Sequence, residues 1–139
     1  MEKRDYLLRE IQKIGILMSA LRQKLLGGKG NLAVTSENQI EETKEMLFND
    51  LNFDLDAFLS LNIEDGNEYI CSFKGFNIEN MESFAKFLSD IACSDNCDNS
   101  NKYLEKALQL YELCNFKSDT YSFEREMEIN YLKNAIKSP

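Results

Sequence analysis

The sequence predicts an all-α fold of six or seven helices joined by short turns. Over most of its 139 residues, apolar side chains recur at spacings of three and four, which is the period of an α-helix. The only proline is the last residue, so nothing inside the chain forbids a helix, and the glycines gather where the periodic runs end. The length and the 43% hydrophobic content are those of one domain, residues 1–139, with a core of its own.

The apolar pattern of residues 4–26 predicts the first helix. This helix belongs to a basic, amphipathic N-terminal segment, residues 1–30. Its apolar seam alternates between spacings of four and three, and Leu8 and Leu17 widen this seam to either side. We therefore expect the helix to pack against two neighbours rather than one. The seam consists of Leu7, Ile11, Ile14, Met18, Leu21 and Leu25.

Three helices are expected in the middle of the chain. Ser36 followed by Gln39 has the spacing of a capping box, which indicates the start of the second helix. Residues 55–61 are typical of a short third helix. Asn62 is a suitable cap for a fourth, but the apolar run after it also fits a strand, so both helix and strand stay open for residues 62–75.

Three further helices are expected in the C-terminal half. Asn77 caps the first of them, which continues to residue 92 with apolar residues at spacings of three and four. The polar residues 94–101 indicate a loop. Residues 102–116 and 120–136 predict the last two helices. The apolar residues of the final helix are Phe123, Met127, Ile129, Leu132 and Ile136.

Residues 102–116 resemble the second helix of a tetratricopeptide repeat. In such a helix a small, an aromatic and another small residue follow at spacings of four and three, and Ala107, Tyr111 and Cys114 match these places. The small residues let the two helices of a repeat approach closely, and the aromatic residue fills the gap between repeats. The resemblance implies a tetratricopeptide-like array of helical hairpins over residues 77–139.

Three segments together resemble a bacterial family of small tetratricopeptide-like helical proteins that is catalogued as a domain of unknown function. The segments are residues 4–15, 107–112 and 118–129, and the Tyr-Ser-Phe-Glu-Arg-Glu string at residues 121–126 is the most specific part. The family brings no assigned activity, cofactor or catalytic residue. The resemblance therefore implies a fold and leaves the function open.

The composition excludes much catalytic and metal chemistry. The chain has no histidine, so Ser-His and Cys-His nucleophilic pairs cannot form. A zinc site would need all four cysteines, whose spacing differs from paired CxxC motifs, so we expect reduced thiols and no metal. A calcium loop that starts at Asp95 fails at Ser100, where the turn requires glycine. The cysteines are Cys71, Cys93, Cys97 and Cys114.

Two other motifs favour structural interpretations. Glu124 and Glu128 share a helix face, but the favourable interaction of acids with the start of a helix explains them better than a paired-carboxylate site. Residues 25–31 contain glycines and a lysine, yet they lack the phosphate-loop spacing and follow a helix, so we interpret them as a helix end and linker. We therefore expect no catalytic residue and no cofactor, and we interpret the protein as a non-enzyme.

Charge is unevenly distributed along the chain. Residues 1–30 hold seven basic and three acidic residues, a net charge of +4. Because the whole chain has a net charge of −8, the other 109 residues have a net charge of −12. We prefer a protein-interaction module that uses the apolar seam to bind a protein partner or itself, as a homo-oligomer. The alternative is an adaptor that binds a membrane or nucleic acid through Arg9, Lys13 and Lys24, which the acidic body disfavours because it repels polyanions.

The N-terminus is charged where a signal peptide needs an apolar run. No window of the chain approaches the roughly 18 apolar residues of a membrane span. We therefore expect a cytoplasmic protein.

Overall fold

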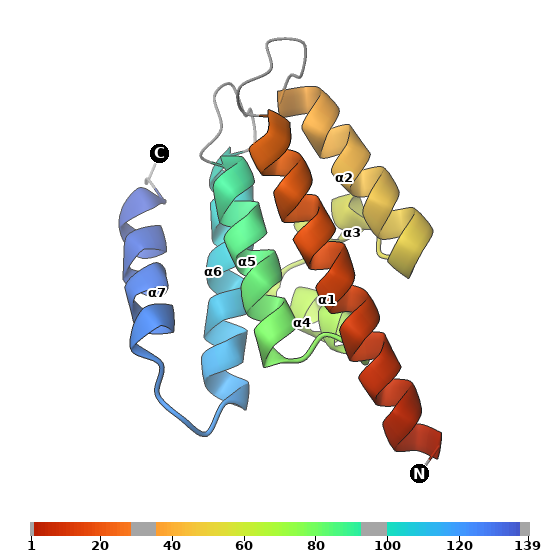
Figure 1. Ribbon diagram of the computed structural model, residues 1–139. Helices are drawn as coiled ribbons and strands as arrows, with labels where there is room; N and C mark the ends of the chain where they lie inside the picture. Colours follow the sequence, from red (N-terminus) through yellow and green to blue (C-terminus); the bar gives the residue numbers. More distant parts are fainter. Residues whose placement is uncertain (1, 29–35, 93–99, 137–139) are drawn as a thin grey trace.

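The computed structural model describes residues 2–28, 36–92 and 100–136, which form seven α-helices and no strand (Figure 1). The all-α fold class and the expected number of helices are confirmed. Residues 63–71 are helical, which resolves the open choice between helix and strand. The helices are α1 (Glu2–Gly28), α2 (Ser36–Leu51), α3 (Leu55–Ser60), α4 (Ile63–Cys71), α5 (Ile78–Ala92), α6 (Ser100–Lys117) and α7 (Phe123–Ala135).

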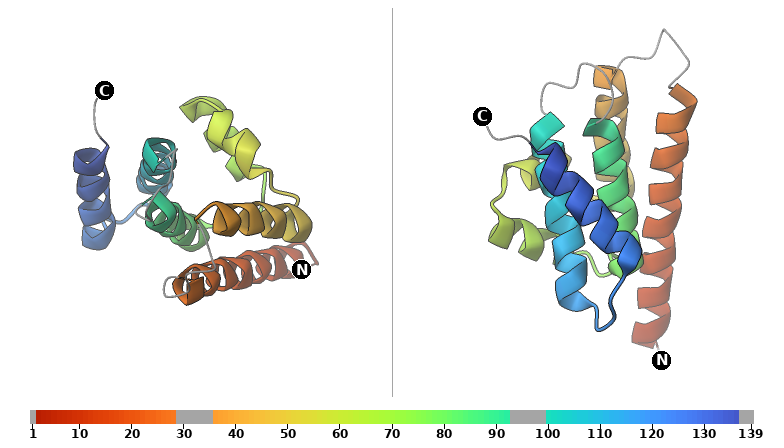
Figure 2. Two further views of the ribbon diagram at one scale, coloured as in Figure 1. Left: turned by 90° about the horizontal axis from the view of Figure 1, so that it is seen from above. Right: turned by 90° about the vertical axis from the view of Figure 1, so that its left-hand side faces the viewer.

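The long helices pack side by side in a row. α1 contacts both α2 and α5, which confirms that the first helix has two neighbours, and Figure 2 shows it along the same side of both. α5 packs along α6, and α6 packs against α7, so α2 and α7 lie at opposite edges of the row (Figure 2). The short helices α3 and α4 cover one side of this row, where both contact α6. α5 and α6 therefore separate the N-terminal helix from α7.

An aromatic cluster around Phe53 joins the short helices to the row. After α2 the chain turns at Asn52, whose φ of 61° lies in the left-handed region that asparagine tolerates better than most residues. The backbone N–H of Asn52 donates to the carbonyl oxygen of Phe48 at 2.9 Å, and that of Phe53 donates to the carbonyl oxygen of Leu47 at 3.1 Å. The turn carries the Phe53 ring into the core, where its centroid lies 5.2–6.0 Å from those of five other rings. These rings belong to Phe58, Tyr69, Phe73, Phe76 and Phe84.

Two predicted helix caps are confirmed. Asn62 precedes α4, and its Oδ1 accepts a hydrogen bond from the backbone N–H of Asp65 at 2.7 Å. Asn77 precedes α5, and its Oδ1 accepts one from the backbone N–H of Asn80 at 2.9 Å. Each side chain satisfies a backbone donor that the first turn of a helix leaves free, so these starts are set by local chemistry.

Three helix starts differ from the expected ones. The last helix begins at Phe123 rather than at residue 120, because Ser122 caps it and accepts a hydrogen bond from the backbone N–H of Arg125 at 3.2 Å. α6 begins at Ser100, so the last two residues of the expected loop are helical, since polar residues fit the solvent-exposed first turn of a helix. Residues 94–99 lie outside the described residues. α2 begins at Ser36 itself, whereas a capping residue at this position would precede the first helical residue. The side chain of Ser36 lies outside the described residues.

The turn before α5 lies directly against the backbone of α1. A Cβ atom on Gly75 would lie 2.6 Å from the carbonyl carbon of Glu10 and 2.8 Å from Cδ1 of Ile14, so this position has no room for a side chain. Asn80 is buried, and its Nδ2 donates to the carbonyl oxygens of Ile11 at 3.0 Å and Gly75 at 2.8 Å. This junction fixes the point at which α1 joins the other helices.

Replacing Gly75 by alanine should lower the free energy of unfolding by about 2 kcal/mol, because the added methyl group overlaps a packed backbone. Gly15→Ala is the matched control, since its Cβ would approach only Oδ1 of Asn80, at 3.4 Å, and alanine is the better helix former. Urea unfolding followed by circular dichroism measures both variants. Wild-type stability for Gly75→Ala would contradict the close approach.

Candidate functional site

The apolar seam of α1 is divided between the core and the solvent. Its four C-terminal members are buried in the core of the chain itself, so a second copy cannot bind them. Leu7 is exposed and Ile11 is half-buried, since α1 extends beyond the other helices at this end (Figure 1). The expected interaction surface is therefore corrected to the N-terminal end of the seam. The buried members are Ile14, Met18, Leu21 and Leu25.

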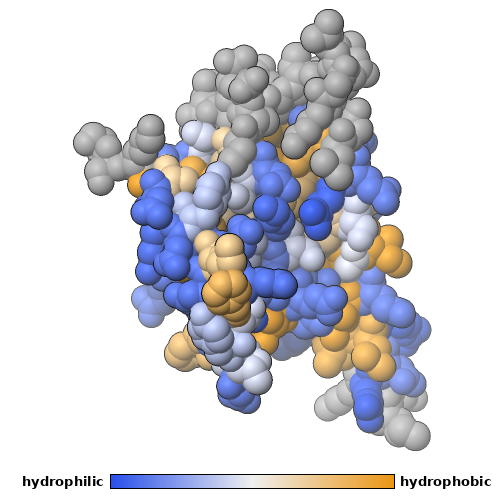
Figure 3. All heavy atoms as spheres, turned by 60° about the vertical axis from the view of Figure 1, so that its left-hand side comes forward, coloured by the Kyte–Doolittle hydropathy of each residue, from blue (hydrophilic) through white to orange (hydrophobic). Residues whose placement is uncertain are grey.

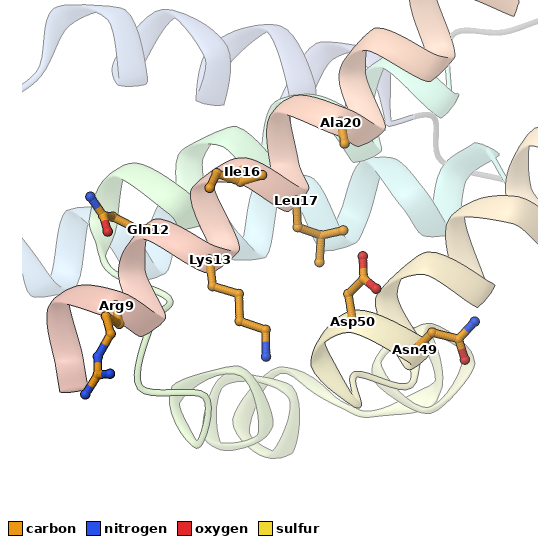
Figure 4. A pocket seen from close by; sticks show the side chains of 8 residues that line it. All are labelled: Arg9, Gln12, Lys13, Ile16, Leu17, Ala20, Asn49 and Asp50. Atoms are coloured by element: carbon orange, nitrogen blue, oxygen red, sulfur yellow. The ribbon is translucent and has the colours of Figure 1, made fainter.

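Of the three basic residues proposed to bind an anionic surface, Lys24 is paired with an acid of the same chain, and the other two line a groove that also contains one. Arg9 and Lys13 line an open groove of about 580 Å³ between α1 and the end of α2, and Asp50 belongs to the same groove. In Figure 4 the Lys13 side chain points into the space between the two helices. Nζ of Lys24, the third basic residue, lies 3.2 Å from Oε2 of Glu42. The ion pair leaves Lys24 only partly available to an anionic surface, whereas Arg9 and Lys13 are exposed.

The outer side of α7 is apolar, like its inner side. Ile129 and Leu132 face the core and are buried. Phe123, Met127 and Tyr131 follow at a spacing of four and are 67%, 57% and 49% exposed. We call these three residues the outer α7 stripe. Figure 3 views the molecule with this side forward and shows apolar atoms along its middle, between hydrophilic ones.

Two further exposed aromatic residues precede the outer α7 stripe in the chain. Phe116, at the end of α6, is 88% exposed, and Tyr121 lies exposed between α6 and α7. The sequence lists Phe123 and Met127 with Ile129 and Leu132 as the apolar residues of this helix, and the structure places the first two on its exposed side. The spacing could have shown that these residues do not share one face of the helix. Side chains rotate by about 100° per residue, so positions 127 and 129 lie about 200° apart around the helix axis.

An ion pair between the buried Arg125 and the partly exposed Glu82 fixes the rotation of α7 about its own axis. Arg125 lies on the inner side of the helix and is buried. Its Nε donates to Oε2 of Glu82 on α5 at 2.9 Å, and its Nη1 donates to Oδ1 of Asn115 on α6 at 3.0 Å. Breaking such a pair would leave a buried charge without its partner, which costs several kcal/mol. The inward position of this arginine therefore holds the outer α7 stripe towards solvent.

The glutamates of α7 contribute to helix electrostatics and to an ion pair. Glu124 and Glu126 lie in the first turn, where negative charge is favourable. Oε1 of Glu128 lies 3.8 Å from Nζ of Lys86 on α5. This arrangement agrees with the structural interpretation of Glu124 and Glu128.

A buried lysine on α6 closes the junction between α3 and α4. Lys106 is 5% exposed, and its Nζ donates to the carbonyl oxygen of Leu61 at 2.6 Å and to Oε1 of Gln109 at 3.0 Å. The same nitrogen lies 4.9 Å from the centroid of the Phe58 ring. Burial lowers the pKa of Lys106, and the positive charge of Lys102 lowers it further. The enclosed amine holds the end of α3 and is closed to a substrate.

The expected absence of a metal site concerns residues that the structure describes only in part. Cys71 is half-buried, whereas Cys93, Cys97 and the loop that starts at Asp95 lie outside the described residues. Within the described part of the chain, no three side chains of the metal-binding types are grouped so that they could hold an ion.

The remaining cysteine, Cys114, packs where α6 approaches α5. It is fully buried, and its Sγ donates to the carbonyl oxygen of Ile78 at 3.7 Å. Burial raises the pKa of the Cys114 thiol to about 12, and the negative charge of Glu82 adds to the effect. The thiol therefore stays protonated near neutral pH, which is the unreactive form.

Comparison of the chain with protein-family models, with curated proteins and with solved structures found no match. The tetratricopeptide-like arrangement thus remains a prediction from the residues of α6. Among the helices that the structure describes, none combines the length and the apolar character that crossing a membrane requires.

The raised pKa of Cys114 predicts a loss of stability at alkaline pH. Above pH 9, its ordinary pKa, the thiol ionises in the unfolded chain but stays protonated in the folded one until about pH 12. The folded state then holds more protons, so the free energy of unfolding falls as pH rises through this window, by up to about 1.4 kcal/mol per pH unit.

Urea unfolding between pH 8 and pH 10.5 under reducing conditions measures this effect. Cys114→Ala should remove most of the decline that starts near pH 9, whereas the control Cys71→Ala keeps it because Cys114 is still present. The same decline in both variants would show that Cys114 is not its source.

Proposed function

We propose that this chain is a non-enzymatic protein-interaction module that associates with copies of itself. The observation that carries the proposal is the outer α7 stripe, with Phe116 before it, on a helix whose opposite side is already packed in the core. Proteins that work as monomers rarely expose contiguous apolar patches, because burying such a patch against a partner is favourable. The proposal includes a tetratricopeptide-like arrangement of residues 77–139 and a cytoplasmic location.

The side chains most suited to catalysis are placed unfavourably for it, which supports the non-enzymatic part. The chain contains no histidine. The Lys106 amine is enclosed by its hydrogen-bond acceptors, and the Cys114 thiol is fully buried with a raised pKa. A nucleophile needs both access to a substrate and a reactive protonation state, and these two groups lack at least the first.

An adaptor for anionic surfaces is the weaker candidate. It would use Arg9, Lys13 and Lys24 together, but Lys24 already pairs with Glu42 and the groove beside the other two contains Asp50. The chain carries a net charge of −8, which disfavours contact with a phosphate backbone or an anionic membrane. The exposed apolar residues of α7 would have no role in such contacts.

Self-association should appear in sedimentation velocity experiments as a sedimentation coefficient that rises with protein concentration. Met127→Glu should return the protein to the monomer value, because it places a carboxylate in the middle of the outer α7 stripe. Ile63→Glu is the matched control, since Ile63 is equally apolar and 66% exposed but lies on α4. Wild-type protein that remains monomeric up to millimolar concentration would contradict the proposal.

A further inference from the structure

The N-terminal end of α1 is a second exposed apolar surface. The junction with Gly75 contacts α1 at Glu10, so residues 4–9 extend about 9 Å beyond it. We call these residues the N-terminal arm. Tyr6, Leu7 and Leu8 follow one another in it and are 56%, 40% and 52% exposed. Within the described part of the chain, none of the three belongs to the buried core or to the half-buried apolar residues packed against it, which points to a contact outside the chain.

The arm and the outer α7 stripe are complementary in charge. The arm, residues 4–9, carries Arg4 and Arg9 against Asp5, a net charge of +1. Glu124, Glu126 and Glu128 flank the outer α7 stripe, because each lies next to one of its residues in the sequence or one turn from it. Opposite charges at the rims of two apolar surfaces speed their encounter and select one pairing over others.

Pairing of α7 with itself is less favourable. In an antiparallel two-fold pair of α7 helices, the same flank of each helix comes together. Glu124 and Glu128 share one flank, because they are four residues apart. Such a pair would therefore place four carboxylates along one edge of the contact, where they repel one another.

The two surfaces are also placed so that a pair of chains can use both at once. Figure 3 shows the apolar atoms of α7 and those near the N-terminal end of α1 on the same side of the molecule. A two-fold axis that runs in the plane of this side, between the two surfaces, brings the arm of each chain to α7 of the other. The contact then occurs twice, which helps to reach the roughly 1,200 Å² that stable interfaces bury.

We infer that the N-terminal arm of one chain packs on the outer α7 stripe of a second copy, and that the reciprocal contact closes a dimer. The inference rests on the proposed self-association and specifies its two surfaces. It assigns a role to the exposed residues Tyr6, Leu7 and Leu8, which the fold of a single chain does not use.

Mixing two variants tests the inference. Leu8→Glu damages the arm and leaves α7 intact, and Met127→Glu damages α7 and leaves the arm intact. Each variant alone should raise the dimer dissociation constant at least about 30-fold, which is the effect of removing an interface hot spot. In an equimolar mixture the intact arm of the Met127→Glu chain meets the intact α7 of the Leu8→Glu chain, so dimers should return in part. Sedimentation velocity of each variant and of the mixture measures this, and circular dichroism checks that both are folded.

Three outcomes would count against the inference, and they separate it from the proposed function. Dimers of wild-type affinity in Leu8→Glu, together with monomeric Met127→Glu, would overturn the arm contact and retain self-association through α7. A mixture that sediments as the sum of its components would also overturn the arm contact. Wild-type protein that is monomeric at every concentration would overturn both the inference and the proposed function.

Discussion

The close approach of the turn before α5 to the backbone of α1 is the constraint on which the rest of the arrangement depends. Gly75 has no room for a side chain against Glu10, and Asn80 donates to carbonyl oxygens on both sides of this junction. The junction divides α1 into two parts with different roles. The residues after it, such as Met18, are buried in the core, whereas the arm before it is held out in solvent by a rigid helix.

A second constraint acts at the opposite edge of the row. The pair between Arg125 and Glu82 is partly buried, so α7 can pack on α6 in essentially one rotation about its axis. That rotation buries Ile129 and turns Met127 outward. This one partly buried ion pair therefore decides which apolar side of α7 becomes core and which becomes surface. Both constraints hold exposed apolar residues on helices, where they lose little further conformational freedom on binding.

The sequence predicts well what depends on local chemistry. The helical period and the caps Asn62 and Asn77 act within one turn, so the all-α fold and several helix starts could be read directly. The carbonyl oxygen that Lys106 binds belongs to Leu61, 45 residues away in the chain, and no local pattern reveals this partner. For the same reason, spacing shows that α7 has two apolar sides but cannot tell which one faces the core. The division of the α1 seam depends equally on a distant contact with Gly75.

Hydrogen–deuterium exchange of the full chain at low and high protein concentration, followed by mass spectrometry, is the most direct measurement of the contact between copies. If the arm packs on α7 of a second chain, exchange in residues 4–9 and in residues 123–131 should slow together as the concentration rises. Exchange in α4, which lies outside both surfaces, should stay constant. Slower exchange in only one of the two segments, or in neither, would contradict the contact.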